Sequence, residues 1–117
     1  INIGVSYDII VRPNENSNEV LLKCTEKLIE FFQSEKMELN APIFISSVRT
    51  ELDKIDGVQT VVSVKFNNLI DRNQGYSGNV YPIENAIRND ILYPPIDVAI
   101  FEVKHPRRDI IGRVVEN

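Results

Sequence analysis

Apolar and polar residues alternate most regularly over the first eleven residues of the chain. Every second residue there is apolar, as Val5 illustrates, and the residues between are mostly polar or small. A similar alternation recurs over residues 58–66, where Val62 and Val64 share one side. A period of two is typical of a β-strand with one buried face. The pattern therefore predicts strands at 1–11 and at 58–66.

Between these two strands the apolar residues recur at intervals of three and four, which is the spacing of an amphipathic helix. This spacing predicts a helix over residues 17–36, with Asn16 as its N-cap. A second, shorter helix is predicted to begin at a capping serine, either Ser46 or Ser47. It is expected to end before Gly57, because glycine readily adopts the left-handed conformation that stops a helix.

The remainder of the chain has fewer periodic patterns and more turn-forming residues. Pro94 and Pro95 favour an extended backbone, and Pro106 lies in a charged stretch that suits a turn. Pro82 suits the first position of a short helix. The elements predicted here are a loop at 67–79, a short helix within 81–91, and short strands at 98–103 and 110–115.

These elements together predict an α+β fold. A strand–helix–helix–strand module, ferredoxin-like in character, is followed by an extended C-terminal arm with two short strands. We assign an α+β domain to residues 1–68, and a loop and arm to residues 69–117. Two strands cannot hold a sheet alone, so further strands have to come from the arm or from another chain. The arm is therefore expected to pack either on the first domain or on a neighbouring subunit.

Composition and charge narrow the classes of protein. The chain has 117 residues, of which 43% are hydrophobic and 26% charged, as in ordinary globular domains. Its net charge is −4, with one local basic patch at 104–113, so nucleic acid is not an expected partner. No apolar run approaches the roughly 20 residues that span a bilayer. The chain opens on a strand pattern without an initiator Met, so we expect a fragment of a longer protein and no signal peptide.

Candidate chemistry is sparse. His105 is the only histidine and has no cysteine near it in sequence, so a turn histidine is favoured over a metal ligand. Cys24 lies on the apolar side of the first predicted helix, which favours a buried structural thiol over a nucleophile. Gly75 and Gly78 lack the flanking strand and helix of a phosphate-binding loop. The prediction is that the protein is not an enzyme and has no catalytic residues, no metal site and no cofactor.

The arm carries the most unusual composition, since it is rich in apolar residues and interrupted by prolines. Apolar residues on an extended segment suit a surface that docks on a partner, and nearby arginines suit the polar rim of such an interface. The predicted interface residues are Ile91, Leu92, Tyr93, Pro94, Pro95, Ile96, Ile100, Phe101, Arg107 and Arg108.

Two stretches resemble a known family. The first is APIFISSVRTELDKIDGVQTVVSVKFNN, a short extended piece, a helix, a Gly-Val turn and a strand; the second is YPIENAIRNDILYPPIDVAIFEVKHPRRDIIGRVV. The second contains Ile-Phe-Glu at 100–102, Pro-Arg at 106–107 and Asp-Ile-Ile-Gly at 109–112. Both are similar to the C-terminal part of the baseplate J-like family, the baseplate wedge proteins of contractile-tailed bacteriophages.

The resemblance implies a structural role. Such proteins pair and form a ring around the tail hub, so it implies that the chain contacts itself, as a dimer within a larger ring, and other wedge proteins. It implies a location in the virion tail baseplate after assembly in the host cytoplasm, and no membrane partner. The alternative is a small-ligand- or metal-binding ferredoxin-like regulatory domain; an enzyme fragment is the least favoured reading.

Overall fold

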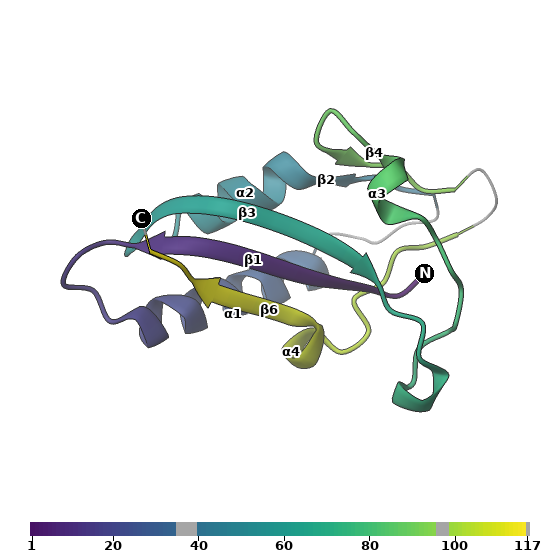
Figure 1. Cartoon of the computed structure of the whole chain (residues 1–117), viewed down its shortest axis with the longest axis horizontal. Coiled ribbons are helices and arrows are strands. Elements are labelled where there is room, and N and C mark those ends of the chain that lie inside the picture. Colours follow the sequence, from purple (N-terminus) through teal and green to yellow (C-terminus); the bar gives the residue numbers. More distant parts are fainter. Residues whose placement is uncertain (35–39, 96–98, 117) are drawn as a thin grey trace.

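A three-stranded sheet forms the centre of the molecule. The computed structural model describes residues 1–34, 40–95 and 99–116 of the chain. The central strand is β1 (Ile3–Val11), which pairs antiparallel with β3 (Val58–Asn68) and parallel with β6 (Ile110–Val114). Both long strands were predicted from their period of two, and β6 confirms the predicted strand at the end of the arm. The α+β class is therefore confirmed (Figure 1).

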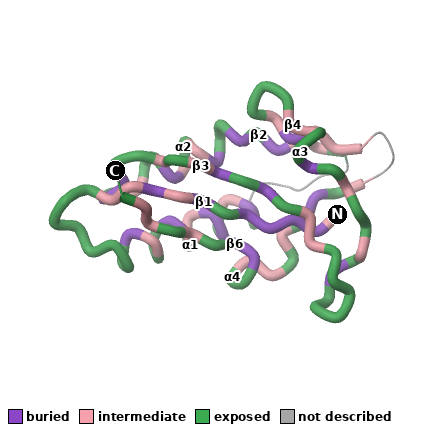
Figure 2. The backbone as a smooth tube through the Cα atoms, in the orientation of Figure 1, coloured by how far each residue is buried: buried purple, intermediate pink, exposed green. Residues whose placement is uncertain are grey.

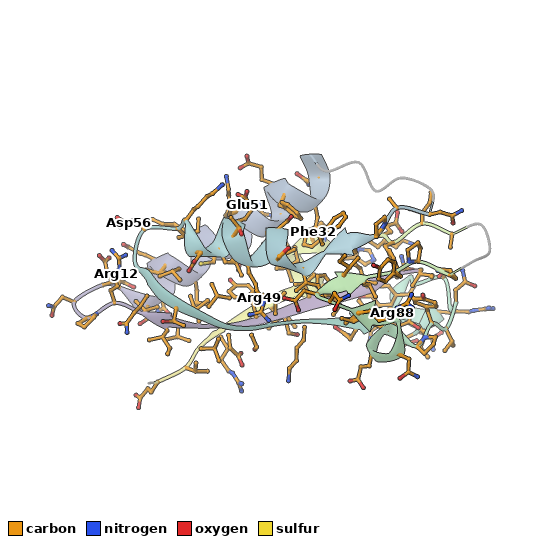
Figure 3. The ribbon with its side chains drawn as sticks, turned by 90° about the horizontal axis from the view of Figure 1, so that it is seen from above. Arg12, Phe32, Arg49, Glu51, Asp56 and Arg88 are labelled. Atoms are coloured by element: carbon orange, nitrogen blue, oxygen red, sulfur yellow. The ribbon has the colours of Figure 1, made fainter. Side chains whose placement is uncertain are left out.

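Two helices cover one face of this sheet, as the views in Figures 1 and 3 show. Helix α1 (Ser17–Ser34) begins as predicted, because the side-chain oxygen of Asn16 accepts hydrogen bonds from the backbone N–H groups after it. Helix α2 (Ile45–Asp53) begins one residue before the predicted serine caps. Its N-cap is Phe44, which has no capping side chain, so the serine-cap prediction is wrong.

A second, smaller sheet was not predicted. It contains β2 (Ile43–Phe44), β5 (Ile91–Leu92) and β4 (Ile87–Arg88) in that order. The hairpin between β4 and β5 turns through Asn89 and Asp90, both with positive φ, as a two-residue primed turn requires. The short helix predicted within 81–91 is limited to α3 (Ile83–Ala86), because this hairpin takes the residues after it.

The arm follows the edge of β1 in two steps. Glu102 bridges to Asn2 in parallel orientation, then α4 (Pro106–Asp109) turns the chain, and β6 continues along the same edge. Residues 99–103 make only this one bridge, so the predicted strand there is wrong for the described part of 98–103. The charged stretch around Pro106, predicted as a turn, forms one turn of helix.

The core lies between the sheet and the helices. Ile3, Val5, Tyr7 and Ile9 all project from β1 into it, and each is at most 1% exposed. Figure 2 shows this buried stretch running along β1. Tyr7 crosses beneath Gly112 of β6 to donate its hydroxyl to the carbonyl of a residue in α1, 3.2 Å away. Tyr7 thus links the central strand of the sheet to the first helix.

Candidate interaction site on the C-terminal arm

The predicted interface residues divide by their burial. Leu92 and Phe101 are 0% and 3% exposed and belong to the core of the chain, so neither presents area to a partner in this structure. Ile100 is 43% exposed. Ile96 lies outside the described residues. The half-buried members of the predicted set are Ile91, Tyr93, Pro94 and Pro95.

Arg107 is engaged by the chain's own first helix. Its guanidinium donates to both carboxylate oxygens of Glu26, at 2.7 and 3.3 Å. The hydrogen bonds from Arg107 lower the pKa of the Glu26 carboxyl below its usual range. Both side chains are exposed, so the pair contributes little to stability but ties α4 to α1.

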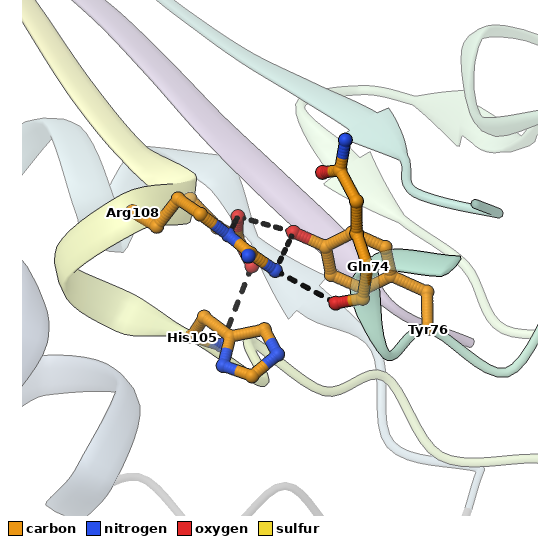
Figure 4. A network of polar contacts seen from close by, with 5 residues as sticks. Gln74, Tyr76, His105 and Arg108 are labelled. Atoms are coloured by element: carbon orange, nitrogen blue, oxygen red, sulfur yellow. Dashed lines mark hydrogen bonds and ion pairs between the residues drawn. The ribbon is translucent and has the colours of Figure 1, made fainter. Parts of the chain in front are cut away.

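Arg108 lies in a polar network between α4 and the loop that contains the 3₁₀ helix η1 (Arg72–Gln74), shown in Figure 4. Its guanidinium donates to the hydroxyl of Tyr76 at 2.8 Å and to the carbonyl of Gln74 at 3.0 Å. The same guanidinium lies 5.2 Å above the Tyr76 ring, a cation–π contact. Sequence reasoning placed Arg108 at an intermolecular rim, whereas here it holds an internal loop.

Asp109 is the acceptor at the centre of this network and is 8% exposed. The Tyr76 hydroxyl donates to it at 2.5 Å, and the backbone N–H of His105 donates to its other oxygen at 3.3 Å. Burial is the main cause that raises the pKa of the Tyr76 hydroxyl above its usual value. The hydrogen bond to the Asp109 carboxylate raises this pKa further. A buried carboxylate with several donors is a stable way to keep a charge inside a protein.

The loop is held from a third point. Lys104 donates a hydrogen bond to the carbonyl of Gly75, and the ring of His105 packs edge-on against Tyr76 with centroids 5.7 Å apart. The Nε2 atom of His105 is buried and has no hydrogen-bond partner among the described residues. Nothing in the sequence pattern connected Tyr76 with the arm, because the two segments are about 30 residues apart and meet only through the fold.

A groove of about 750 Å³ opens beside the N-terminal end of the sheet. It is lined by Pro95 and Ile100 of the predicted interface and by Val80, which is 76% exposed. Val80 was not among the predicted interface residues. It is an isolated valine in a polar loop, so it forms no periodic pattern that would have identified it. This groove brings two residues of the predicted interface together with an exposed valine.

The remaining candidate chemistry has a structural explanation. Cys24 is fully buried, and burial raises the pKa of its thiol to about 11. Within the described ranges, no three His, Cys, Asp or Glu side chains are grouped to hold a metal ion. No described helix is long and apolar enough to cross a membrane.

Comparison with known proteins does not assign the chain to a family. No protein-family model matches the sequence. A search of curated proteins likewise finds no significant match.

Proposed function

We propose that the chain is a structural subunit of a phage tail baseplate wedge that mediates subunit contacts in a ring around the tail hub. Its partners are a second copy of itself and other wedge proteins, and its location is the virion tail baseplate after assembly in the host cytoplasm. The resemblance of the arm to baseplate wedge proteins supports this. The structural observation that carries it is the exposure of Ile100 and Val80 in one groove beside Pro95.

The groove has the composition of a modest protein interface. An apolar centre with a polar rim is the usual arrangement, and here Glu102 and Lys104 are the charged residues on its border. Leu92 and Phe101 stabilise the arm from inside the chain, which presents Ile100 on a preformed surface. A preformed surface loses little conformational entropy when a partner docks.

The second candidate is a small-ligand- or metal-binding regulatory domain of ferredoxin-like character. Both helices lie on one face of the sheet, which is a feature shared with ferredoxin-like domains. A hollow of about 650 Å³ between α1 and α4, lined by charged residues such as Glu26 and Lys104, is the observation in its favour. A thermal-shift screen with divalent metals and metabolites tests it, because a ligand that binds the folded state raises the melting temperature.

The test of the wedge proposal is sedimentation of the chain and of variants in the groove. Ile100→Asp and Val80→Asp place charges on the apolar surface and are expected to weaken self-association or docking to a wedge protein. Leu22→Asp is the matched control, since Leu22 is 60% exposed on α1, away from the groove. Circular dichroism should show all three variants folded, because each changed side chain is exposed.

Two results would count against the proposal. One is a chain that stays monomeric at all concentrations and copurifies with no tail protein when expressed with its neighbouring genes. The other is an equal loss of association in Leu22→Asp, which would move the interface to α1. A strong shift in melting temperature with one metal or metabolite would favour the regulatory domain instead.

A further inference from the structure

The groove at Ile100 has two walls that come from distant parts of the chain. One wall belongs to the arm and includes Pro95, Ile100 and Glu102. The other, which we call the loop wall, is formed by residues 77–81, and Asn2 completes the lining. The loop wall is neither helix nor strand. Its position is therefore set by side-chain contacts and not by regular secondary structure.

Asn2 is a buried polar residue that contacts both walls, and it is only 3% exposed. Its Oδ1 atom accepts a hydrogen bond from the backbone N–H of Ser77 at 2.7 Å, and its Nδ2 donates to Oε1 of Glu102 at 2.9 Å. A side-chain amide has one accepting and one donating end, and a backbone N–H and a carboxylate require one each. The two partners therefore fix a single orientation of the Asn2 amide.

The backbone of the arm is fixed beside Asn2. The N–H of Glu102 donates to the carbonyl of Ile1, and the N–H of Ile3 donates to the carbonyl of Glu102, both at 2.9 Å. These two bonds form the parallel bridge between Asn2 and Glu102. The Glu102 carboxylate is thus brought to the Asn2 amide by the docking of the arm on the first residues of the chain.

A second asparagine holds the remainder of the loop wall. Asn68, at the end of β3, donates from Nδ2 to the carbonyl of Asn79 at 3.1 Å and accepts at Oδ1 from the N–H of Tyr81 at 2.8 Å. The same Nδ2 donates to the backbone carbonyl of Asn2 at 3.2 Å. Two asparagine side chains therefore hold the loop wall, and Val80 is left 76% exposed on it.

The network at Tyr76 is a separate anchor between the arm and the loop. It binds the chain at residues 74–76, before the loop wall begins, and its donors come from Lys104 and Arg108. This anchor keeps the loop attached when the contact between Asn2 and the arm is broken. Loss of that contact should therefore loosen the loop wall without unfolding the loop.

We propose that Asn2 is a relay through which the docked arm positions the loop wall, so that the groove forms only while Glu102 lies against Asn2. Asn2 is then a positioning residue, and the docking surface is conditional on the arm. The inference rests on the proposed wedge function, because the groove is the docking surface named there, and it adds how that surface is controlled. A partner that contacts both Val80 and Ile100 meets a preformed surface only when the relay is intact.

The test measures amide hydrogen exchange at Ser77 by NMR on the full 117-residue chain. In Glu102→Ala the Asn2 amide loses its acceptor, and exchange at Ser77 should become about fivefold faster, as for the loss of one ordinary hydrogen bond. Glu102→Gln keeps a side-chain carbonyl that accepts from Asn2, so exchange should stay at the wild-type rate. Glu84→Ala is the matched control, because Glu84 is exposed on α3 and belongs to neither wall.

A reversed pair tests the contact from its other side. Asn2→Asp places two carboxylates against each other and should also speed exchange at Ser77. Combining it with Glu102→Gln restores one donor and one acceptor, because the new glutamine donates and the new aspartate accepts. Exchange should then return to near the wild-type rate, a rescue that a merely structural role of Asn2 would not produce. Circular dichroism checks folding, and the exposed Glu102 variants decide the question if Asn2→Asp does not fold.

Four results would overturn the relay. They are unchanged exchange at Ser77 in Glu102→Ala, equal acceleration in Glu102→Gln, equal acceleration in Glu84→Ala, and no rescue in a folded combined variant. Sedimentation of the wild-type chain separates the two proposals. A monomeric chain with the Ser77 effect supports the relay and counts against the wedge function. An associating chain whose Ser77 amide does not respond to Glu102 overturns the relay and leaves the wedge function standing.

Discussion

At the scale of single residues, the charged groups of the arm are used mainly inside the molecule. Arg108 and Asp109 hold the loop at Tyr76, and Arg113 pairs with Asp8 on the central strand. A sequence pattern records that such residues are charged but not which partner each one meets. Their roles are therefore set by the loop and strand that the fold brings beside them.

Removing the Tyr76 hydroxyl should destabilise the fold. In Tyr76→Phe, Asp109 loses its 2.5 Å hydrogen bond while its carboxylate stays buried. The carboxylate keeps only the longer hydrogen bonds from His105 and Arg108, at 3.3 and 3.5 Å. A lost hydrogen bond typically costs about 1 kcal/mol, so urea denaturation should show a loss of that order. Tyr93→Phe is the control, because the Tyr93 ring keeps its contact with Arg88. An unchanged midpoint in Tyr76→Phe would show that the network contributes nothing to stability.

The ion pair between Asp8 and Arg113 should make stability depend on pH in the acid range. Hydrogen bonds from Arg113, at 3.0 and 3.2 Å, hold the pKa of the Asp8 carboxyl below its usual value. A carboxyl group whose pKa is lower in the folded chain than in the unfolded chain stabilises the protein at pH values above its unfolded pKa of about 4. This stabilisation is lost as the pH falls below that value.

Arg113→Gln should therefore lower the melting temperature slightly at pH 7 and not at pH 2. The effect is small because Arg113 is exposed. Thermal melts of the wild-type chain and the variant across this pH range provide the measurement. A difference between the two chains that stays constant down to pH 2 would exclude this pair as its source.

At the scale of elements, β6 shows how local periodicity and a distant contact combine. Its apolar residues predicted a short strand, but only the structure shows that it lies parallel to β1, with Gly112 over Tyr7. A Cβ at Gly112 would collide with the Tyr7 ring. The glycine in this strand is therefore required by the close approach of an aromatic side chain from its neighbour.

Gly112→Ala should weaken the pairing of β6 with β1. Inserting a methyl group into a packed contact typically costs about 1–3 kcal/mol, because the Tyr7 ring has to move from its site. Ile111→Ala is the neighbouring control, since Ile111 is 61% exposed and should change stability little. Chemical denaturation of both variants checks the prediction, and equal stability of the two would contradict the collision.

The hairpin of β4 and β5 shows why short elements are hard to predict. Each strand has two residues, so no alternation can develop, and the turn at Asn89 and Asp90 provides the only local signal. The helical spacing of the preceding residues was also compatible with a longer α3. Pairing with β2, from a distant part of the sequence, resolves the choice in favour of the hairpin.

At the scale of the whole molecule, the arm is part of the core and not an appendage. Phe101 and Ile110 are both 3% exposed, and β6 completes the main sheet beside β1. The first 68 residues therefore lack one strand of their own sheet when the arm is removed. The same segment of the arm therefore has two roles. Its buried face, with Phe101, stabilises the fold, and its exposed face, with Ile100, lines the groove.

Two neighbouring substitutions separate these contributions. Phe101→Ala should destabilise the chain by about 3–5 kcal/mol, as expected for a large buried aromatic residue. Ile100→Ala, at an exposed position, should leave the unfolding free energy nearly unchanged. Urea denaturation measures both, and a fully stable Phe101→Ala chain would show that the arm does not complete the core.

The sequence by itself determined the two long strands, the two main helices and the α+β class. Each of these has enough residues for its period to be counted, and Asn16 supplied a local signal for the start of α1. Tertiary structure decided how the arm is used. Apolar residues such as Phe101 carry the same local signal whether they meet their own core or a partner, and only the completed sheet beside β1 shows that Phe101 faces inward while Ile100 faces out.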